Sequence, residues 1–89
     1  MKRLRIKVYG RVQGVAFRHD AQNKANQLGV KGFVKNMPDG SVKIEAEAEE
    51  KILNDFVFWC REGPDLARVE DIETEVIPVK DDNTFNIRH

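Results

Sequence analysis

Two hydrophobic periods alternate along this chain, and the order in which they occur limits the folds that it can adopt. Apolar residues recur at every second position from Leu4 to Val8 and from Val42 to Ala48, a pattern typical of strands with one buried face. Apolar residues recur three or four positions apart from Phe17 to Leu28 and from Ile52 to Cys60. The second pattern predicts two amphipathic helices.

The segments between these four complete the order of elements. Val30–Met37 is predicted to be a strand, and Pro38–Gly40 is predicted to be the turn that joins it in a hairpin to the strand that follows. Leu66–Val79 is extended and rich in β-branched residues, but its inward-facing phase slips within Val69–Ile72, which predicts a β-bulge. The alternation in Phe85–Ile87 predicts a short final strand.

The resulting order is strand, helix, strand, strand, helix, strand, followed by the short final strand. This order predicts the α+β class and a ferredoxin-like βαββαβ sandwich. Crossover handedness then places both helices on one face of an antiparallel sheet. Two domains would need a longer chain than 89 residues, so residues 1–89 are expected to form a single domain.

The charge balance and the single cysteine exclude several classes of function. Lys and Arg number 15 and Asp and Glu number 15, which argues against binding of nucleic acid or membrane through a broad basic surface. Cys60 alone can form neither an intrachain disulfide nor a multi-cysteine zinc site, and it fits a reducing compartment. No apolar run of about 18 residues and no signal peptide is visible, so a cytoplasmic location is expected.

The stretch from Gly10 to Arg18 is the first candidate site. Gly10 and Gly14 give the loop backbone freedom, and the loop leads directly into the predicted helix, whose first N–H groups favour an anion. Arg18 lies in the first helical turn, where the helix dipole disfavours a cation, so a bound anion is one explanation for it. The alternative is a tight turn with a solvated arginine, and the spacing matches neither a P-loop nor a dinucleotide fingerprint.

Asn36 is the second candidate. It stands at the end of a predicted strand, where its amide can donate to and accept from a water molecule. An asparagine before a turn is more often there to form the turn, so this residue by itself leaves both interpretations open.

Together the two stretches resemble the acylphosphatase family. The first, Gly10–Arg18, reads GRVQGVAFR, and the second reads GFVKN over Gly32–Asn36 and continues as Gly40–Val42. The resemblance also covers Gly63-Pro64, Leu66–Val69 and the order of elements, so it spans nearly the whole chain as a single acylphosphatase-like domain. Two positions depart from the family pattern: Met37 stands where threonine is frequent, and Ala48 stands where glycine is usual.

The resemblance implies hydrolysis of acyl phosphates to a carboxylate and inorganic phosphate, without a metal, a cofactor or a covalent intermediate. It implies that Arg18 and Asn36 are catalytic, with Asn36 positioning the attacking water and the phosphate itself taking the proton. It implies a phosphate-binding set made of loop backbone amides and one side chain: Gln13, Gly14, Val15, Ala16, Phe17 and Arg18. The partners expected are the acyl phosphate and inorganic phosphate, with no nucleic acid and no membrane, and the chain is expected to be a monomer.

Other polar residues are expected to have structural or solvent-exposed roles. His19 is expected at the surface and Asp20 with its side chain turned away from the loop, while His89 is expected to fray. Cys60 is expected to be a buried, inert thiol. The Lys and Glu residues that alternate with apolar ones are expected to face solvent.

Three alternative functions follow from the same features. A non-catalytic anion-binding module would share the loop but would not need Asn36. A domain that handles carbamoyl phosphate, like the one in large hydrogenase maturation proteins, is disfavoured by the length of the chain. An RNA-recognition domain is faintly suggested by Gly32 and Phe33, but Lys35 stands where an aromatic residue should stack on a base.

Overall fold

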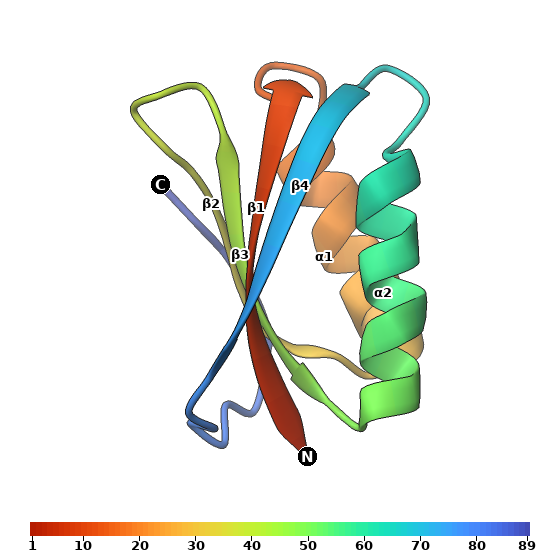
Figure 1. Cartoon of the computed structure of the whole chain (residues 1–89), viewed down its shortest axis with the longest axis vertical. Coiled ribbons are helices and arrows are strands. Elements are labelled where there is room, and N and C mark those ends of the chain that lie inside the picture. Colours follow the sequence, from red (N-terminus) through yellow and green to blue (C-terminus); the bar gives the residue numbers. More distant parts are fainter.

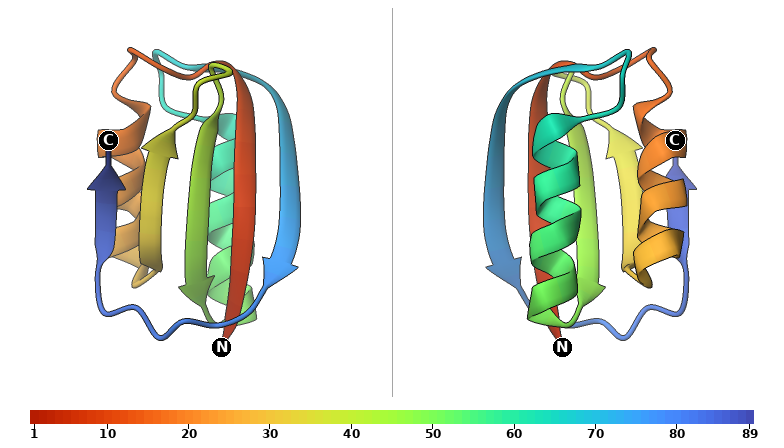
Figure 2. Two further views of the ribbon diagram at one scale, coloured as in Figure 1. Left: turned by 90° about the vertical axis from the view of Figure 1, so that its left-hand side faces the viewer. Right: turned by 90° about the vertical axis from the view of Figure 1, so that its right-hand side faces the viewer.

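The computed structural model describes residues 1–89 and shows a five-stranded sheet with two helices packed on one face (Figures 1 and 2). The elements, in chain order, are β1 (Lys2–Arg11), α1 (Phe17–Leu28), β2 (Lys31–Asn36), β3 (Val42–Ala48), α2 (Glu50–Glu62), β4 (Arg68–Ile77) and β5 (Phe85–Arg88). Neither helix has the length and apolar character needed to cross a membrane.

The strands lie in the order β4-β1-β3-β2-β5. The first four of these pair antiparallel, which confirms the expected ferredoxin-like sandwich and its β2–β3 hairpin. The fifth strand adds a parallel pair, because β5 lies beside β2 and runs in the same direction. The connection from β4 to β5 runs past the opposite end of the sheet from the β1–α1 loop, and β5 then returns toward that loop (Figure 2). The last residues of the chain are therefore brought back to the β1–α1 end of the molecule.

The core lies between the sheet and the helices. The inward residues of β1 and β3, Ile6, Val8, Val42 and Ile44, are fully buried, as their alternation predicts. The α1 residues Phe17, Ala21 and Ala25 and the α2 residues Leu53, Phe56 and Cys60 pack against them. The small alanines let α1 approach the sheet closely. Cys60 is confirmed as a buried thiol, and burial raises its pKa, so it is unsuited to act as a nucleophile.

The predicted β-bulge is present where β1 meets β4. Tyr9 lies opposite Asp71 but Gly10 lies opposite Val69, so the pairing register shifts between Tyr9 and Gly10. Gly10 has a φ of 124°, and a Cβ added there would lie 2.2 Å from the carbonyl oxygen of Arg68. Only glycine fits this close approach. The bulge therefore sets the direction in which β1 enters the loop before α1.

The other face of the sheet is not wholly solvated, and the expectation for two of its glutamates is wrong. Glu45 and Glu47 are 4% and 1% exposed, and both form ion pairs with Arg3, which is 1% exposed. The connection between β4 and β5 covers them, since the backbone amides of Lys80 and Asp81 donate to the Glu47 carboxylate. Alternation along β3 identifies the two faces of the strand, but it does not show that a distant loop buries the second face.

Candidate active site

The β1–α1 loop and the β2–β3 turn lie at the same end of the sheet (Figure 2). The side-chain amide nitrogen of Gln13 donates to the carbonyl oxygens of Met37, at 2.8 Å, and Ser41, at 2.9 Å. This pair of hydrogen bonds links the two stretches that were singled out in the sequence. The position of the loop is therefore fixed relative to the end of β2.

The backbone of the loop alternates between buried anchors and exposed small residues. Val12 and Val15 are buried, whereas Gly14 and Ala16 are exposed and adopt left-handed conformations with φ of 73° and 62°. A left-handed alanine carries conformational strain, of the kind that persists where the surroundings hold a loop in one shape. The two valines thus hold the loop on the core while its backbone stays accessible at the surface.

A run of backbone N–H groups in this loop and the first helical turn has no partner within the protein. None of the backbone hydrogen bonds outside the helices and strands is donated by residues 13 to 19. The first backbone amide at the start of α1 that has a partner is that of Asp20, which donates to the Ala16 carbonyl oxygen at 3.0 Å. No side chain caps this end of the helix. Unpartnered N–H groups at the positive end of a helix dipole form a site for an anion.

The Arg18 side chain extends from this helix end toward the end of β5. One terminal nitrogen, Nη1, donates to the Arg88 carbonyl oxygen at 3.0 Å and lies 3.2 Å from Nδ1 of His89. A guanidinium can only donate, so the His89 ring accepts through Nδ1. The Nε and Nη2 groups of Arg18 donate to no protein atom and are free to bind a planar oxyanion.

Asn36 closes the other side of the same cavity. It is the last residue of β2 and pairs with the buried Val42, so it belongs to the face of the sheet that carries the helices. Its side-chain amide forms no hydrogen bond with the protein. The cavity has a volume of about 320 Å³, and it is lined by Val12, Gly14, Ala16, Phe17, Arg18, His19, Asn36, Ile87 and His89.

The residues expected from the sequence take different places around this cavity. Arg18 and Asn36 line it together with Gly14, Ala16 and Phe17. Gln13 and Val15 do not line it, because the Gln13 side chain binds the β2–β3 turn and the Val15 side chain is buried in the core. Any contribution that these two make to the cavity must come from their backbone amides.

The part of the cavity wall that Ile87 of β5 and the following His89 supply was not predicted from the sequence. His89 was expected to fray, but the structure places its ring against Arg18, and Ile87 lines the cavity beside it. The cause is the parallel pairing of β5 with β2, which aligns Ile87 with Val34 and brings His89 near Asn36. No local pattern in the sequence signals which strand β5 joins. His19 is exposed, as expected, and its side chain forms part of the rim.

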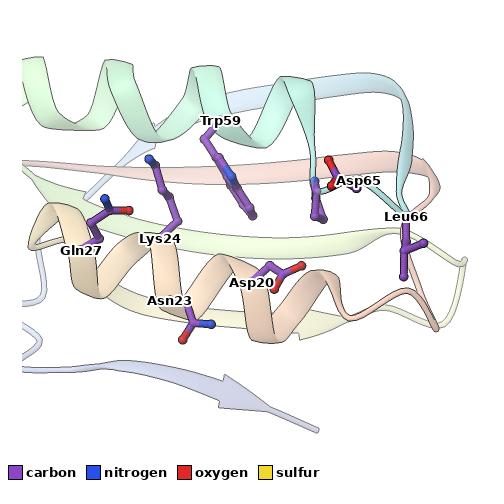
Figure 3. Close-up of a pocket in the computed structure, with 8 residues that line it drawn as sticks. Asp20, Asn23, Lys24, Gln27, Trp59, Asp65 and Leu66 are labelled. Atoms are coloured by element: carbon purple, nitrogen blue, oxygen red, sulfur yellow. The ribbon is translucent and has the colours of Figure 1, made fainter.

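A second cavity, of about 460 Å³, lies in the groove between the helices (Figure 3). Asp20 and Lys24 of α1 and Trp59 of α2 line it, and Figure 3 shows the Asp20 side chain on the side of α1 that faces α2. Asp20 is therefore turned away from the first cavity, which Arg18 and Asn36 line, as expected. No Asp or Glu side chain lines the first cavity.

Comparison with known proteins identifies relatives along the whole chain. The acylphosphatase family model matches residues 4–87. An acylphosphatase from Anaeromyxobacter dehalogenans is 51% identical over 87 residues, covering 97% of this chain and 94% of that protein. The crystal structure of an acylphosphatase from Bacillus subtilis superposes with a TM-score of 0.97 at 38% identity and covers 100% of both chains. This chain also superposes on 12% of full-length HypF, solved in a phosphate- and nucleotide-bound form, with a TM-score of 0.92 and 32% identity.

Proposed function

This chain belongs to the acylphosphatase family, whose members hydrolyse acyl phosphates, and from that premise we propose which of its residues carry out each part of the reaction. The enzyme is a hydrolase that acts on acid anhydrides, with an acyl phosphate as substrate and inorganic phosphate as one product. Phosphoryl transfer of this kind depends mainly on positioning and on stabilisation of negative charge. The cavity beside Arg18 supplies both.

We assign phosphate binding to the loop and to Arg18. The unpartnered amides of residues 13 to 18 face the developing negative charge on the phosphoryl oxygens, and the free Nε and Nη2 of Arg18 bind two of those oxygens. These donors are fixed before the substrate arrives, because Gln13 fastens the loop and two acceptors hold Arg18. Preorganised donors stabilise the transition state without reorganising during the reaction.

We assign the attacking water to Asn36. Its amide oxygen accepts one hydrogen bond from the water, which leaves a lone pair of the water free to attack phosphorus. The new bond joins the water oxygen to phosphorus, while the bond between phosphorus and the acyl oxygen breaks and its electron pair leaves with the carboxylate. The proton of the water passes to a phosphoryl oxygen. No Asp or Glu side chain lines the cavity, and a carboxylate leaving group needs no strong acid.

One observation carries this proposal: Arg18 and Asn36, from separate motifs, line one cavity with the loop. We expect Arg18→Gln and Asn36→Ala each to lower phosphate release from benzoyl phosphate by about 100-fold or more, with an unchanged melting temperature. Inorganic phosphate should inhibit the wild type and Asn36→Ala competitively, but should inhibit Arg18→Gln only weakly.

Matched controls are available on the outside of the helices. Arg61→Gln and Asn23→Ala change exposed residues of α2 and α1 that lie outside the cavity, and both should retain wild-type rates. Near-normal turnover by Arg18→Gln or Asn36→Ala would contradict the assignment. Phosphate binding without any turnover by the wild type would instead favour a non-catalytic anion-binding module.

We further propose that the enzyme acts as a cytoplasmic monomer without a nucleic-acid partner. The single cysteine is free and buried, which suits a reducing compartment. The Phe33 ring, the one aromatic ring that β2 could offer to a base, is covered by the Arg88 guanidinium at 3.8 Å from the ring centre. Elution at the monomer mass in size-exclusion chromatography, unchanged by added RNA, tests the monomeric state and the absence of an RNA partner.

A further inference from the structure

The sheet is electrically polarised from one edge to the other although the chain has no net charge. The edge strand β4 carries Glu70, Asp71, Glu73 and Glu75 and begins with one cation, Arg68. At the opposite edge, β2 and β5 carry only cations and no carboxylate. Since the strand order is β4-β1-β3-β2-β5, positive charge accumulates on the side where Arg18 and Asn36 lie.

A row of cations crosses the sheet at this side, and it is referred to below as the cation row: Lys7, Lys43, Lys35 and Arg88. Lys7 pairs with Lys43, Lys43 with Lys35, and Lys35 with Arg88, on four neighbouring strands. All face away from the helices, because the adjacent Val8, Val42, Val34 and Ile87 belong to the helix-facing side. Like charges directly opposite one another destabilise a sheet, so the row is not explained by stability.

The neutralisation of the cation row is incomplete. The Nζ of Lys7 lies 3.8 Å from Asp39, and at the β4 end of the row Glu73 accepts a hydrogen bond from Tyr9. Lys43 and Arg88 lie over the Phe33 ring, at 5.7 and 3.8 Å from its centre. Neither Lys35 nor Lys43 has an ion pair.

The same face of the sheet shows a contrasting arrangement near the other end. There Arg3 lies directly opposite Glu47, and it also pairs with Glu45 and Asp82, so opposite charges meet. On this face, cations lie directly opposite cations only in the half nearer the β1–α1 loop, and Glu73 of β4 lies opposite Lys7 at the β4 end of the row. Such a surface attracts anions over a distance close to the Debye length, which is about 10 Å at 0.1 M salt.

The cation row ends beside the proposed site. The carbonyl oxygen of Arg88 accepts the hydrogen bond from Arg18, and Asn36 directly follows Lys35 in β2. The side chains of the row lie on the opposite face of the sheet from the cavity, so they act on an approaching anion through the electric field and do not touch the reacting atoms.

We propose that the cation row is an anion-capture surface, which raises the local concentration of phosphorylated substrate at the cavity and favours acyl phosphates that carry further negative charge. This inference rests on the proposed function. It separates two contributions: Arg18 and the loop stabilise the phosphoryl group during reaction, whereas Lys35 and Lys43 increase the rate at which an anion arrives. Capture of this kind changes kcat/KM and its dependence on salt, and it leaves kcat unchanged.

The test is the double variant Lys35→Gln/Lys43→Gln, assayed with benzoyl phosphate over a range of ionic strength. At low ionic strength we expect kcat/KM to fall by about threefold to tenfold, with kcat unchanged and a flatter dependence on salt. The control is Lys51→Gln/Arg61→Gln, which removes the same charge from exposed positions on α2. Its kcat/KM should stay close to the wild-type value.

A second pair of measurements tests the preference for charged substrates. Succinyl phosphate and butyryl phosphate have acyl groups of similar length, but only the first carries an additional carboxylate. The Lys35→Gln/Lys43→Gln variant should lose more kcat/KM with succinyl phosphate than with butyryl phosphate. Equal losses with the two substrates would show that the row does not select for charge on the acyl group.

Two results would overturn the capture proposal while leaving the enzyme assignment intact. One is a double variant whose kcat/KM and salt dependence match those of the control. The other is a fall in kcat equal to the fall in kcat/KM, which would place these lysines in the chemical step. Absence of turnover in the wild type would instead overturn the proposed function. The melting temperature of the double variant should not fall, because a like-charge contact has been removed.

Discussion

Every polar partner of the Arg18 guanidinium belongs to the two residues that follow Ile87. The Arg88 carbonyl oxygen and the His89 ring both accept from the same nitrogen, Nη1. The remaining donors of Arg18 thereby keep a defined orientation. A planar guanidinium that is already oriented loses less conformational freedom when an oxyanion binds.

The residue-scale prediction concerns His89. His89→Ala removes one of the two acceptors that orient Arg18, so we expect kcat/KM for benzoyl phosphate to fall by about twofold to tenfold. The fold should be unaffected because His89 is exposed. His19→Ala is the matched control, since this histidine lines the same cavity without contacting Arg18, and it should behave as the wild type. Equal effects of the two substitutions would contradict an orienting role for His89.

At the scale of single elements, the end of β1 combines two glycines with different constraints. Gly10 and Gly14 both have a positive φ, but a Cβ on Gly10 would overlap the Arg68 carbonyl oxygen, whereas a Cβ on Gly14 would meet nothing within 4 Å. The first glycine is required by the contact between two strands. The second is required only by the conformation of the loop.

These constraints give different expected costs for the same substitution. Gly14→Ala should lower the free energy of unfolding by about 1 kcal/mol, the cost of a left-handed conformation. Gly10→Ala should lower it by more than about 3 kcal/mol, because β1 and β4 must separate to admit the methyl group. Urea unfolding of both variants measures the difference. A similar loss of stability in the two would show that the contact with Arg68 is not limiting.

The elements differ in how far the sequence could predict them. The alternation in β1 and β3, the stripe Phe17-Ala21-Ala25 and the phase slip in β4 are local patterns, and the structure confirms all of them. The burial of Glu45 and the place of His89 depend on where the β4–β5 connection and β5 lie. Those positions are set by pairing between segments far apart in the chain, which leaves no local pattern in the sequence.

At the scale of the whole molecule, a buried ionic cluster ties the β4–β5 connection to the sheet. Arg3 pairs with Glu45, Glu47 and Asp82, and Lys80 also reaches Glu45. Burial favours the neutral form of the Glu45 carboxyl, but hydrogen bonds from Arg3 and Lys80 outweigh it, so the pKa of Glu45 lies below its ordinary value of 4.5. The cluster is therefore held together by ionised carboxylates.

The sign of this pKa shift makes folding sensitive to acid. A carboxyl whose pKa is depressed in the folded state contributes stability above its unfolded pKa, and this contribution is lost as the pH falls through the folded value. We expect the free energy of unfolding to decline as the pH is lowered below about 4.5. Glu45→Gln should be less stable at pH 7 by about 2 kcal/mol and should show a smaller further loss in acid. Chemical unfolding at a series of pH values measures both effects.

Glu75 provides the matched control for this prediction. It lies on the edge strand β4 and pairs with Arg5 of β1, but its side chain is 64% exposed. Exposed pairs contribute little, so Glu75→Gln should change stability by less than about 1 kcal/mol and should keep the wild-type dependence on pH. If the two variants respond to acid alike, the buried cluster is not the origin of the acid sensitivity.

The return of β5 to the side of β2 has a consequence for how the protein is made. Ile87 and His89 complete a cavity whose other walls come from residues 12 to 36, and they are translated after every other part of it. A ribosome adds roughly 5–20 residues each second and shields the most recent ones in its exit tunnel while it does so. A growing chain can therefore assemble most of the sandwich, but its phosphate site stays unfinished until synthesis has passed beyond β5.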